Sequence, residues 1–404
     1  MLNAGATSLI EQRRAMSPPT TTSTRAAPDT QAQALLASFE RAGYARVAPA
    51  ILQPAEPFLD LSGEDIRKRM YLTTDPQGHE LCLRPDLTIP VSRDYLASPS
   101  AGRPEGFCYL GPVFRHRDEG SGEFLQAGIE SFGRPDTAAA DAEMLALGLD
   151  ATAHYGLGAP DIRIGDVALF SALVAALELA PAWKRRLIKD FNHKSSLAHD
   201  LDRLSISASH ARPEYQGVLA ALAGSDPKAA HALVTDLLSI AGITAVGGRS
   251  VGEIADRFLE QSALGAQTTL PQETRELIER FLAIAGDPDE AAAELRAFAR
   301  QAFIGQAKIA LDAPLDLFES RTGFLAARGV DVARLRFSTA FGRGLDYYTG
   351  FVFELHDPGP HANGPLVAGG RYDGLLARLG SAGAIPAVGF AVWIERLAAL
   401  RGGS

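Results

Sequence analysis

Four segments of the sequence combine charged side chains with glycines and aromatic rings. They read LRPDLT (83–88), FRHRDEGSGEFLQAGIE (114–130), GRGLDYYTG (342–350) and GGRYDG (369–374). Glycines let a ligand approach the backbone closely, and buried charges of both signs need partners. A ligand with a carboxylate and an ammonium group would supply those partners. Together the segments indicate a pocket for a small charged molecule, whereas each one alone is equally compatible with ordinary sheet packing.

The side chains that would line this pocket lie on segments expected to be strands or strand ends. Tyr347 and Tyr348 are neighbours in GRGLDYYTG. If that stretch is a strand, their rings point to opposite faces and only one of them faces the pocket. The candidate pocket residues are Asp86, Arg115, Gln126, Glu130, Arg343, Tyr348 and Tyr372.

The elements that must position these residues follow from periodicity and turn signals. Apolar spacing predicts helices over 30–44, 137–156 and from about 167, and also from about Thr88. A hairpin is expected to turn at 76–78, and strands are expected within 106–133, 161–166, 335–357, 365–371 and 384–393. The pattern predicts an α+β fold, an antiparallel sheet flanked by helices.

Composition divides the chain into three parts. Residues 1–31 are rich in Ser, Thr, Ala and Arg without an apolar run, so a disordered tail is expected rather than a secretory signal. Residues 181–310 are rich in Ala, Leu, Arg and Glu without clear strand patterns, which predicts a helical insertion. The segments 32–180 and 311–404 are then expected to form one core.

Charge and cysteine usage narrow the class of protein. A net charge of -9 argues against general nucleic-acid binding. No apolar run is long enough to span a bilayer. Cys82 and Cys108 are the only cysteines and lack metal-ligand spacing, so neither a metal site nor a disulfide framework is expected. A cytoplasmic protein without a cofactor fits these features.

The order of these motifs resembles the histidyl-tRNA synthetase family of class II synthetases. Residues 43–58 resemble motif 1, the dimer-forming element, and 113–133 resemble motif 2. The segments 83–88, 344–354 and 369–380 resemble the histidine-specific signatures, and 386–397 resemble motif 3. The resemblance covers about residues 32–180 and 320–400. It implies a class II synthetase sheet, self-association as a dimer and a pocket shaped for histidine.

The resemblance also assigns roles inside that pocket. Asp86 and Thr88 would hold the ammonium end of histidine, and Arg115 and Gln126 would meet its carboxylate side. Glu130, Tyr348 and Tyr372 would read the imidazole and the ammonium, with Arg343 beside the carboxylate. These pairings suit the donors and acceptors that the side chains offer.

The chain departs from the synthetase pattern on the nucleotide side. Arg117 occupies the position of a glutamate that accepts from adenine, and Trp393 occupies that of a glycine in motif 3. The loop DEGSG (118–122) is short, and the sequence stops at Ser404, where synthetases continue into an anticodon-binding domain. We therefore expect no tRNA partner and no ATP site, although Arg396 of motif 3 is present.

A histidine pocket without an ATP site resembles the regulatory subunits of ATP phosphoribosyltransferase. That resemblance implies a non-catalytic partner of the short-form catalytic subunit, acting in the first step of histidine biosynthesis, with histidine as a feedback ligand. Two alternatives stay open. The retained Arg115, Arg343 and Arg396 would suit an enzyme that activates histidine for a non-tRNA acceptor, and the pocket could also be an empty relic on a scaffold.

Overall fold

A computed structural model describes residues 30–118, 120–191, 197–199, 201–202, 227–240, 245–246, 249–252, 255, 270–302, 306–359 and 364–402. The expected tail lies outside these residues except at its last two positions, which begin a helix. Much of the expected helical insertion also lies outside them. None of the helices described here is long and apolar enough to cross a membrane.

A nine-stranded mixed sheet organises the core, in the order β1-β5-β6-β14-β13-β12-β7-β11-β10. Its central strands are antiparallel, whereas β1–β5 and β11–β7 are parallel pairs. The strands are β1 (Ala45–Arg46), β5 (Glu105–Phe114), β6 (Glu123–Phe132), β7 (Asp161–Asp166), β10 (Ala285–Gly286), β11 (Leu335–Ser338), β12 (Phe351–His356), β13 (Val367–Arg371) and β14 (Ala387–Trp393).

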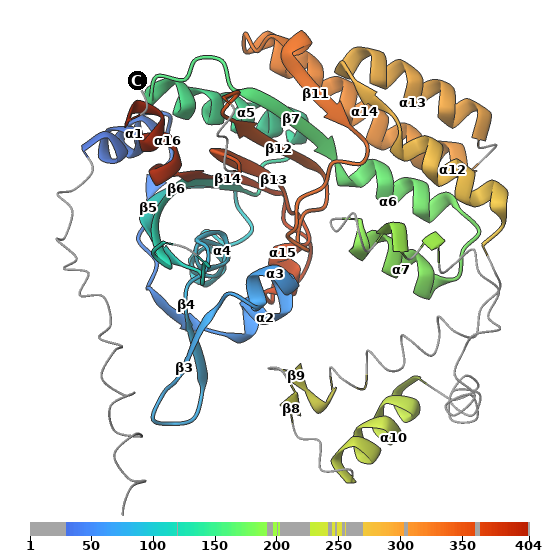
Figure 1. Cartoon of the computed structure of the whole chain (residues 1–404), viewed down its shortest axis with the longest axis horizontal. Coiled ribbons are helices and arrows are strands. Elements are labelled where there is room, and N and C mark those ends of the chain that lie inside the picture. The colour runs from blue at the N-terminus through green and yellow to red at the C-terminus, as the bar shows by residue number, and fades with distance from the viewer. Residues whose placement is uncertain are drawn as a thin grey trace, which may run out of the picture.

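A second sheet has three strands, two of which project from the core as a hairpin (Figure 1). It pairs β2 (Leu52–Pro54), β4 (Glu80–Leu83) and β3 (Tyr71–Thr74) in that order. The turn between β3 and β4 contains Gly78 at φ 89°, a backbone conformation that favours glycine. This confirms the hairpin that the sequence places at 76–78.

Helices cover the large sheet and one side of the molecule (Figure 1). The expected helices at 30–44, from Thr88, at 137–156 and from 167 are all present. The described helices of the core are α1 (Thr30–Arg41), α2 (Glu56–Leu61), α3 (Glu64–Arg67), α4 (Thr88–Ala97), α5 (Thr137–His154), α6 (Val167–Ala176), α15 (Leu375–Arg378) and α16 (Ile394–Gly402). Those of the middle of the chain are α7 (Pro181–Asp190), α10 (Pro227–Ile240), α12 (Gln272–Leu282), α13 (Pro288–Ala302) and α14 (Gln306–Ala327).

The two faces of the large sheet have different surroundings. On one face Phe353 and Phe390 pack towards α5 and α1, and Phe39 meets Phe390 edge-on with ring centroids 5.7 Å apart. Gly148 of α5 allows this close approach, because a Cβ there would lie 3.3 Å from the Phe353 ring. Aromatic rings cover this part of the face, whereas Glu130 lies on the opposite face of the sheet.

Sequence patterns misplaced some local structure. Residues 342–350 are a loop with a turn at Asp346 and Tyr347, not a strand. The glycines and the turn-forming aspartate explain why extended pairing fails there. The middle of the chain also contains short strands that its composition did not reveal. Strands β8 (Ala245–Val246) and β9 (Arg249–Ser250) pair with each other, and β10 joins the large sheet beside β11.

A buried network of ion pairs connects α5 and α14 to the large sheet, on the face opposite the polar one. Asp141 of α5 binds Arg321 of α14 at 2.9 Å and Arg371 of β13 at 2.7 Å. Arg321 also reaches Asp166 at 2.8 Å, and Arg371 reaches Asp373 at 2.8 Å. All except Asp373 are buried. Each charge thus has a partner of opposite sign, as charges removed from water require.

Candidate functional site

The polar face of the large sheet carries a hollow where its strands bear small residues. Gly128 of β6, Gly389 and Ala391 of β14, and Ala368 and Gly370 of β13 lie across neighbouring strands. A Cβ on Gly389 would lie 2.7 Å from the Glu130 carboxyl carbon, so a larger side chain there would displace the carboxylate. The missing side chains leave a cavity of about 160 Å³.

Seven of the eight sequence-predicted residues line this cavity. The group includes Thr88 at the start of α4 and Arg343 in the loop before β12. Gln126 lies opposite Trp393 in the β6–β14 pair, which places both on the cavity floor. The seven are Asp86, Thr88, Arg115, Gln126, Arg343, Tyr348 and Tyr372.

Glu130 lies behind the cavity wall. Its Oε1 accepts hydrogen bonds from the Thr88 hydroxyl at 2.6 Å and the Tyr109 hydroxyl at 3.1 Å, and its Oε2 accepts one from the Tyr372 hydroxyl. Burial raises the pKa of Glu130 to about 7, against the lowering effect of the three hydroxyl donors. The partners of this carboxylate are therefore hydroxyl groups, where the sequence suggested a cation.

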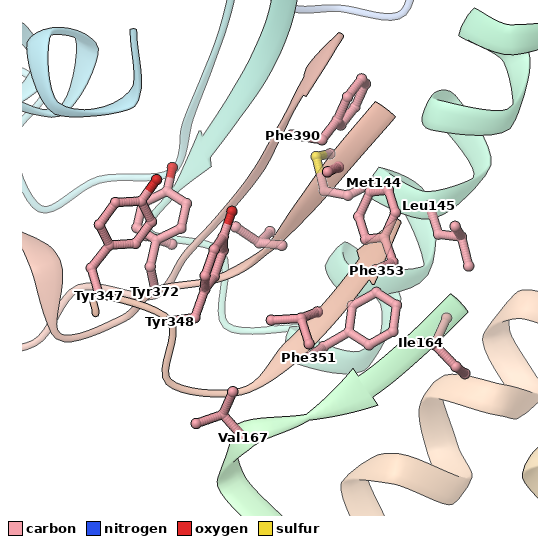
Figure 2. Close-up of a cluster of buried hydrophobic side chains, with 14 of the residues drawn as sticks. Met144, Leu145, Ile164, Val167, Tyr347, Tyr348, Phe351, Phe353, Tyr372 and Phe390 are labelled. Carbon is pink, nitrogen blue, oxygen red and sulfur yellow. The ribbon is translucent and has the colours of Figure 1, made fainter. Parts of the chain in front are cut away.

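The loop 342–350 turns both adjacent tyrosines towards the cavity. Tyr347 and Tyr348 both line it, with ring centroids 4.9 Å apart, and Tyr347 meets Tyr372 edge-on at 5.7 Å. Figure 2 shows the hydroxyls of all three tyrosines pointing the same way. The expectation that only one of Tyr347 and Tyr348 faces the pocket is therefore wrong, because it assumed a strand.

Arg343 is anchored by the chain itself. Its Nη1 donates to the Tyr348 hydroxyl at 2.6 Å and its Nε donates to Glu354 Oε1 at 3.2 Å. Glu354 in turn contacts His356 Nε2 at 3.0 Å. Burial lowers the pKa of Arg343, but Tyr348 and Glu354 outweigh it and the net shift is upward. This guanidinium therefore remains charged at the cavity edge.

Two buried oxygen atoms in another wall of the cavity lack protein partners among the described residues. Asp86 accepts from the Ile89 amide at 3.1 Å through Oδ1, while its Oδ2 and the Oε1 of Gln126 are buried without a hydrogen-bond partner in the part of the chain that the structure describes. Burial raises the pKa of Asp86 despite the nearby Arg115 cation. Two acceptors left open beside a cavity suit a ligand that brings N–H donors.

Arg115 brings a cation to the same wall. Its Nε donates to the Pro85 carbonyl at 2.7 Å, and its guanidinium lies 5.6 Å from the centre of the Phe124 ring. Burial lowers the pKa of Arg115 to about 10, with Asp86 acting in the opposite direction. A desolvated guanidinium in a cavity wall attracts a carboxylate. Together, Arg115, Asp86 and Gln126 can bind the two ends of an amino acid.

The residues that depart from the synthetase pattern, and Arg396 beside them, contact their own neighbours. Trp393 lines the end of the cavity, and the Arg396 guanidinium lies 5.3 Å from its ring centre. Arg396 also donates to the Pro365 carbonyl at 2.6 Å. Arg117 lies over the Phe124 ring at 3.9 Å and 3.7 Å from Glu395. These arginines are held by aromatic rings and by the chain itself.

Sequence reasoning missed several residues of the site. Tyr109 supplies a hydroxyl to Glu130, and Tyr347 completes the tyrosine wall. Tyr109 had a signal, because it lies two residues along from Phe107, the cross-strand partner of Glu130, and so shares its face. Asp65 and Arg69 had none, since Asp65 lies within the four-residue helix α3 and Arg69 lies just after it, in a segment of ordinary composition.

Comparisons with known proteins agree with this geometry. The model of the histidyl-tRNA synthetase family matches residues 21–248 and 232–397. ATP phosphoribosyltransferase regulatory subunits of Brucella canis and Brucella ovis are 42% identical to the chain over 356 residues, which cover 87% of this chain and 92% of each relative. These values are well above those at which only a fold is shared.

Solved structures show the same fold. A structure from Bacillus halodurans, described as an ATP phosphoribosyltransferase regulatory subunit/histidyl-tRNA synthetase, aligns with a TM-score of 0.62 at 22% identity, over 92% of this chain and 77% of that one. A histidine–tRNA ligase subunit from Alicyclobacillus acidocaldarius aligns at 0.58 and 25% identity, over 96% and 98%. The chain belongs to the family of ATP phosphoribosyltransferase regulatory subunits, which is built on the histidyl-tRNA synthetase fold.

Proposed function

We propose that this chain is a regulatory subunit without catalysis of its own. It binds the short-form catalytic subunit of ATP phosphoribosyltransferase and is required for the first step of histidine biosynthesis. The observation that carries the proposal is the contrast within one site. Open acceptors on Asp86 and Gln126 lie beside an amino-acid-sized cavity, whereas Trp393 lines it at the position where the synthetase motif has a glycine.

Reconstitution tests this role directly. The short-form catalytic subunit is co-purified with this chain, and formation of phosphoribosyl-ATP is measured with and without it. Activity that depends on the chain supports the proposal. A catalytic subunit that neither binds the chain nor changes its rate contradicts it.

Histidine is the proposed ligand of the cavity and a feedback inhibitor of the complex. Its ammonium would meet Asp86 and Thr88, its carboxylate would meet Arg115, Arg343 and the side-chain NH2 of Gln126, and its imidazole would lie near Tyr348 and Tyr372. Glu130 would act through the hydroxyls that it binds. A cavity of about 160 Å³ is small beside the ~300–1,000 Å³ of pockets for drug-sized ligands, and so suits a single amino acid.

Self-association as a dimer is the second part of the proposal. The segment from Phe39 to Pro54 would form a two-fold, self-complementary interface. Large apolar side chains are exposed within it and on the nearby strand β3: Ile51 is 43% exposed, Leu52 48% and Leu72 46%. Light scattering at tens of micromolar tests this, and a monomer at that concentration contradicts it.

The free, buried Cys82 and Cys108 support a cytoplasmic location.

An enzyme that activates histidine for a non-tRNA acceptor is the second candidate. The retained cations Arg115, Arg343 and Arg396 favour it, because aminoacyl activation uses arginines to hold reacting phosphate and carboxylate groups. Against it, Arg396 is engaged by the Pro365 carbonyl and the Trp393 ring. Exchange of pyrophosphate into ATP in the presence of histidine separates the two candidates.

A further inference from the structure

Arg84 is the charged residue of the segment LRPDLT that does not line the cavity. It is 3% exposed, and within the described part of the chain its guanidinium donates to backbone carbonyls rather than to a carboxylate. Nη1 donates to the Pro49 carbonyl, and Nε donates to the Pro112 carbonyl at 2.9 Å. A cation removed from water needs partners. Because the partners of Arg84 are main-chain oxygens, its position depends on where those two stretches of chain lie.

The main chain of Arg84 joins the same two stretches. Its amide donates to the Ile51 carbonyl at 2.9 Å, and its carbonyl accepts from the Phe114 amide at 3.0 Å. Gly111 of β5 makes room for the side chain, because a Cβ there would lie 2.5 Å from Nη2 of Arg84. Side chain and backbone thus connect the segment before β2 to the strand β5 through one residue. These hydrogen bonds hold the two stretches at a fixed separation.

The residues next to these contacts carry the wall of the cavity. The Pro85 carbonyl accepts from Arg115 Nε at 2.7 Å, and Asp86 keeps its buried Oδ2 without a partner among the described residues. Asp86 is two residues along from Arg84, and Arg115 directly follows Phe114, which Arg84 binds. A shift of Arg84 therefore moves both charged groups of this wall.

The other side of the connection is an exposed and weakly paired segment. Residues 45–54 contain only the two-residue β1, at the edge of the large sheet, and the three-residue β2. Ile51 and Leu52 are 43% and 48% exposed. Such short pairings fix a backbone weakly. This segment lies within the stretch from Phe39 to Pro54 proposed above as the dimer interface, so a second copy of the chain would cover it.

We propose that Arg84 is a positioning residue that couples self-association to ligand binding. When a second copy covers residues 45–54, the carbonyls that hold Arg84 are fixed, and Arg84 in turn fixes Asp86 and Arg115. Histidine then meets a wall that is already ordered, so less conformational entropy is lost on binding. By linkage, each bound histidine strengthens the dimer by the factor by which dimerisation strengthens its binding. The inference rests on the dimer and the ligand proposed above.

The test measures this linkage on the full chain. The dissociation constant of the dimer is determined by analytical ultracentrifugation of a fluorescently labelled chain, without histidine and with saturating histidine. In the wild type we expect histidine to lower this constant about tenfold for each histidine bound, within the usual range for coupling between two sites. An arginine that only stabilised the fold would change the dimer equally in both conditions, so the ratio of the two constants reports the coupling alone.

Three variants assign the coupling to Arg84. Arg84→Met removes both side-chain hydrogen bonds but keeps an apolar stem, and should reduce the ratio to less than about twofold for each histidine. Arg84→Lys keeps the charge but lacks the fork that reaches Pro49 and Pro112 together, so it should fall in between, and it replaces Arg84→Met if that chain does not fold. Arg93→Met is the matched control. Arg93 donates to Gln53 Oε1 in the same exposed segment at 2.8 Å but does not line the cavity, so this variant should keep the wild-type ratio.

The outcomes separate this inference from the proposed function. A ratio near one in the wild type overturns the inference, and so does a ratio that survives unchanged in the Arg84 variants. A ratio that is also lost in Arg93→Met overturns it too, because any weakening of the segment would then suffice. In each of these cases the chain still dimerises and binds histidine. If the wild type is monomeric or binds no histidine, that part of the proposed function fails, and this inference fails with it.

Discussion

The two ends of the cavity differ in how their polar groups are satisfied. At the amino-acid end, Asp86 and Gln126 keep buried oxygens without a protein partner among the described residues. At the Trp393 end, Arg117 and Arg396 lie outside the cavity lining and are both engaged, Arg117 by Phe124 and Glu395, and Arg396 by Trp393 and Pro365. Buried groups left open cost stability and persist where a ligand satisfies them, whereas groups that satisfy each other need no ligand. The contrast favours ligand binding at Asp86 and Gln126 rather than at Arg117 and Arg396.

The largest expected effect is a loss of stability when the buried ion-pair network is broken. Asp141→Ala leaves Arg321 and Arg371 buried without their shared carboxylate, and should lower the free energy of unfolding by about 3–5 kcal/mol. Denaturant titration measures this. Asp316→Ala is the matched control, since its ion pair with Arg296 is exposed and should change stability by about 0–1 kcal/mol. Equal effects in the two variants would show that the buried network does not support the site.

The second effect depends on pH and distinguishes Glu130 from ordinary carboxylates. The pKa of Glu130 is raised to about 7 in the folded chain, so the folded chain binds this proton more tightly than the unfolded chain does. The stability that this proton contributes is fully present below the pKa of the unfolded chain, about 4.3, and is lost as pH rises through 7. Relative to Glu130→Gln, the wild type should therefore lose up to about 3 kcal/mol between pH 4.5 and pH 8. Parallel stability curves for the two proteins would contradict this assignment.

The third effect concerns histidine affinity. Glu130→Ala removes the carboxylate that orients three hydroxyls and should weaken histidine binding by about 2 kcal/mol, the usual scale for a charged hydrogen bond. Arg117→Ala at the filled end should leave that affinity unchanged, because Arg117 contacts Phe124 and Glu395 rather than the cavity. Calorimetry on both variants tests the contrast. Neither change should disturb binding of the catalytic subunit, if docking surface and pocket are separate.

The last prediction is that one enzymatic activity is absent. The chain alone should show no exchange of pyrophosphate into ATP with histidine, because the resemblance implies that the Trp393 indole would occupy the space of an adenine and that Arg117 stands where synthetases have its acceptor. Exchange above background that is lost in Arg343→Ala would favour the enzyme instead. The double variant Trp393→Gly and Arg117→Glu reopens that end, and ATP binding to it alone would sharpen the comparison.

Sequence alone located the site better than it described the contacts within it. Periodicity predicted the core strands, and charged segments together with the resemblance to the synthetase family predicted the seven residues that line the cavity, because each is tied to a local pattern that survives folding. The partners of Glu130 depend on which strands lie side by side, and periodicity carries no such information. The strand assumed for Tyr347 failed because turn chemistry at Asp346 prevailed over the tyrosines' preference for strands. The pairing of Asp141 with Arg321 spans 180 residues and has no local signal.

That span has a consequence for how the chain folds. Arg321 meets a carboxylate 180 residues away and Arg371 meets the same one 230 residues away, so both contacts close across the middle of the chain. Contacts this distant in sequence form slowly, because the entropy of loop closure is lost before they contribute. Since that cost grows only logarithmically, doubling the intervening length adds about 0.6 kcal/mol. The core can therefore accept a middle segment of very different length, with folding speed affected more by the long closure itself than by what the segment contains.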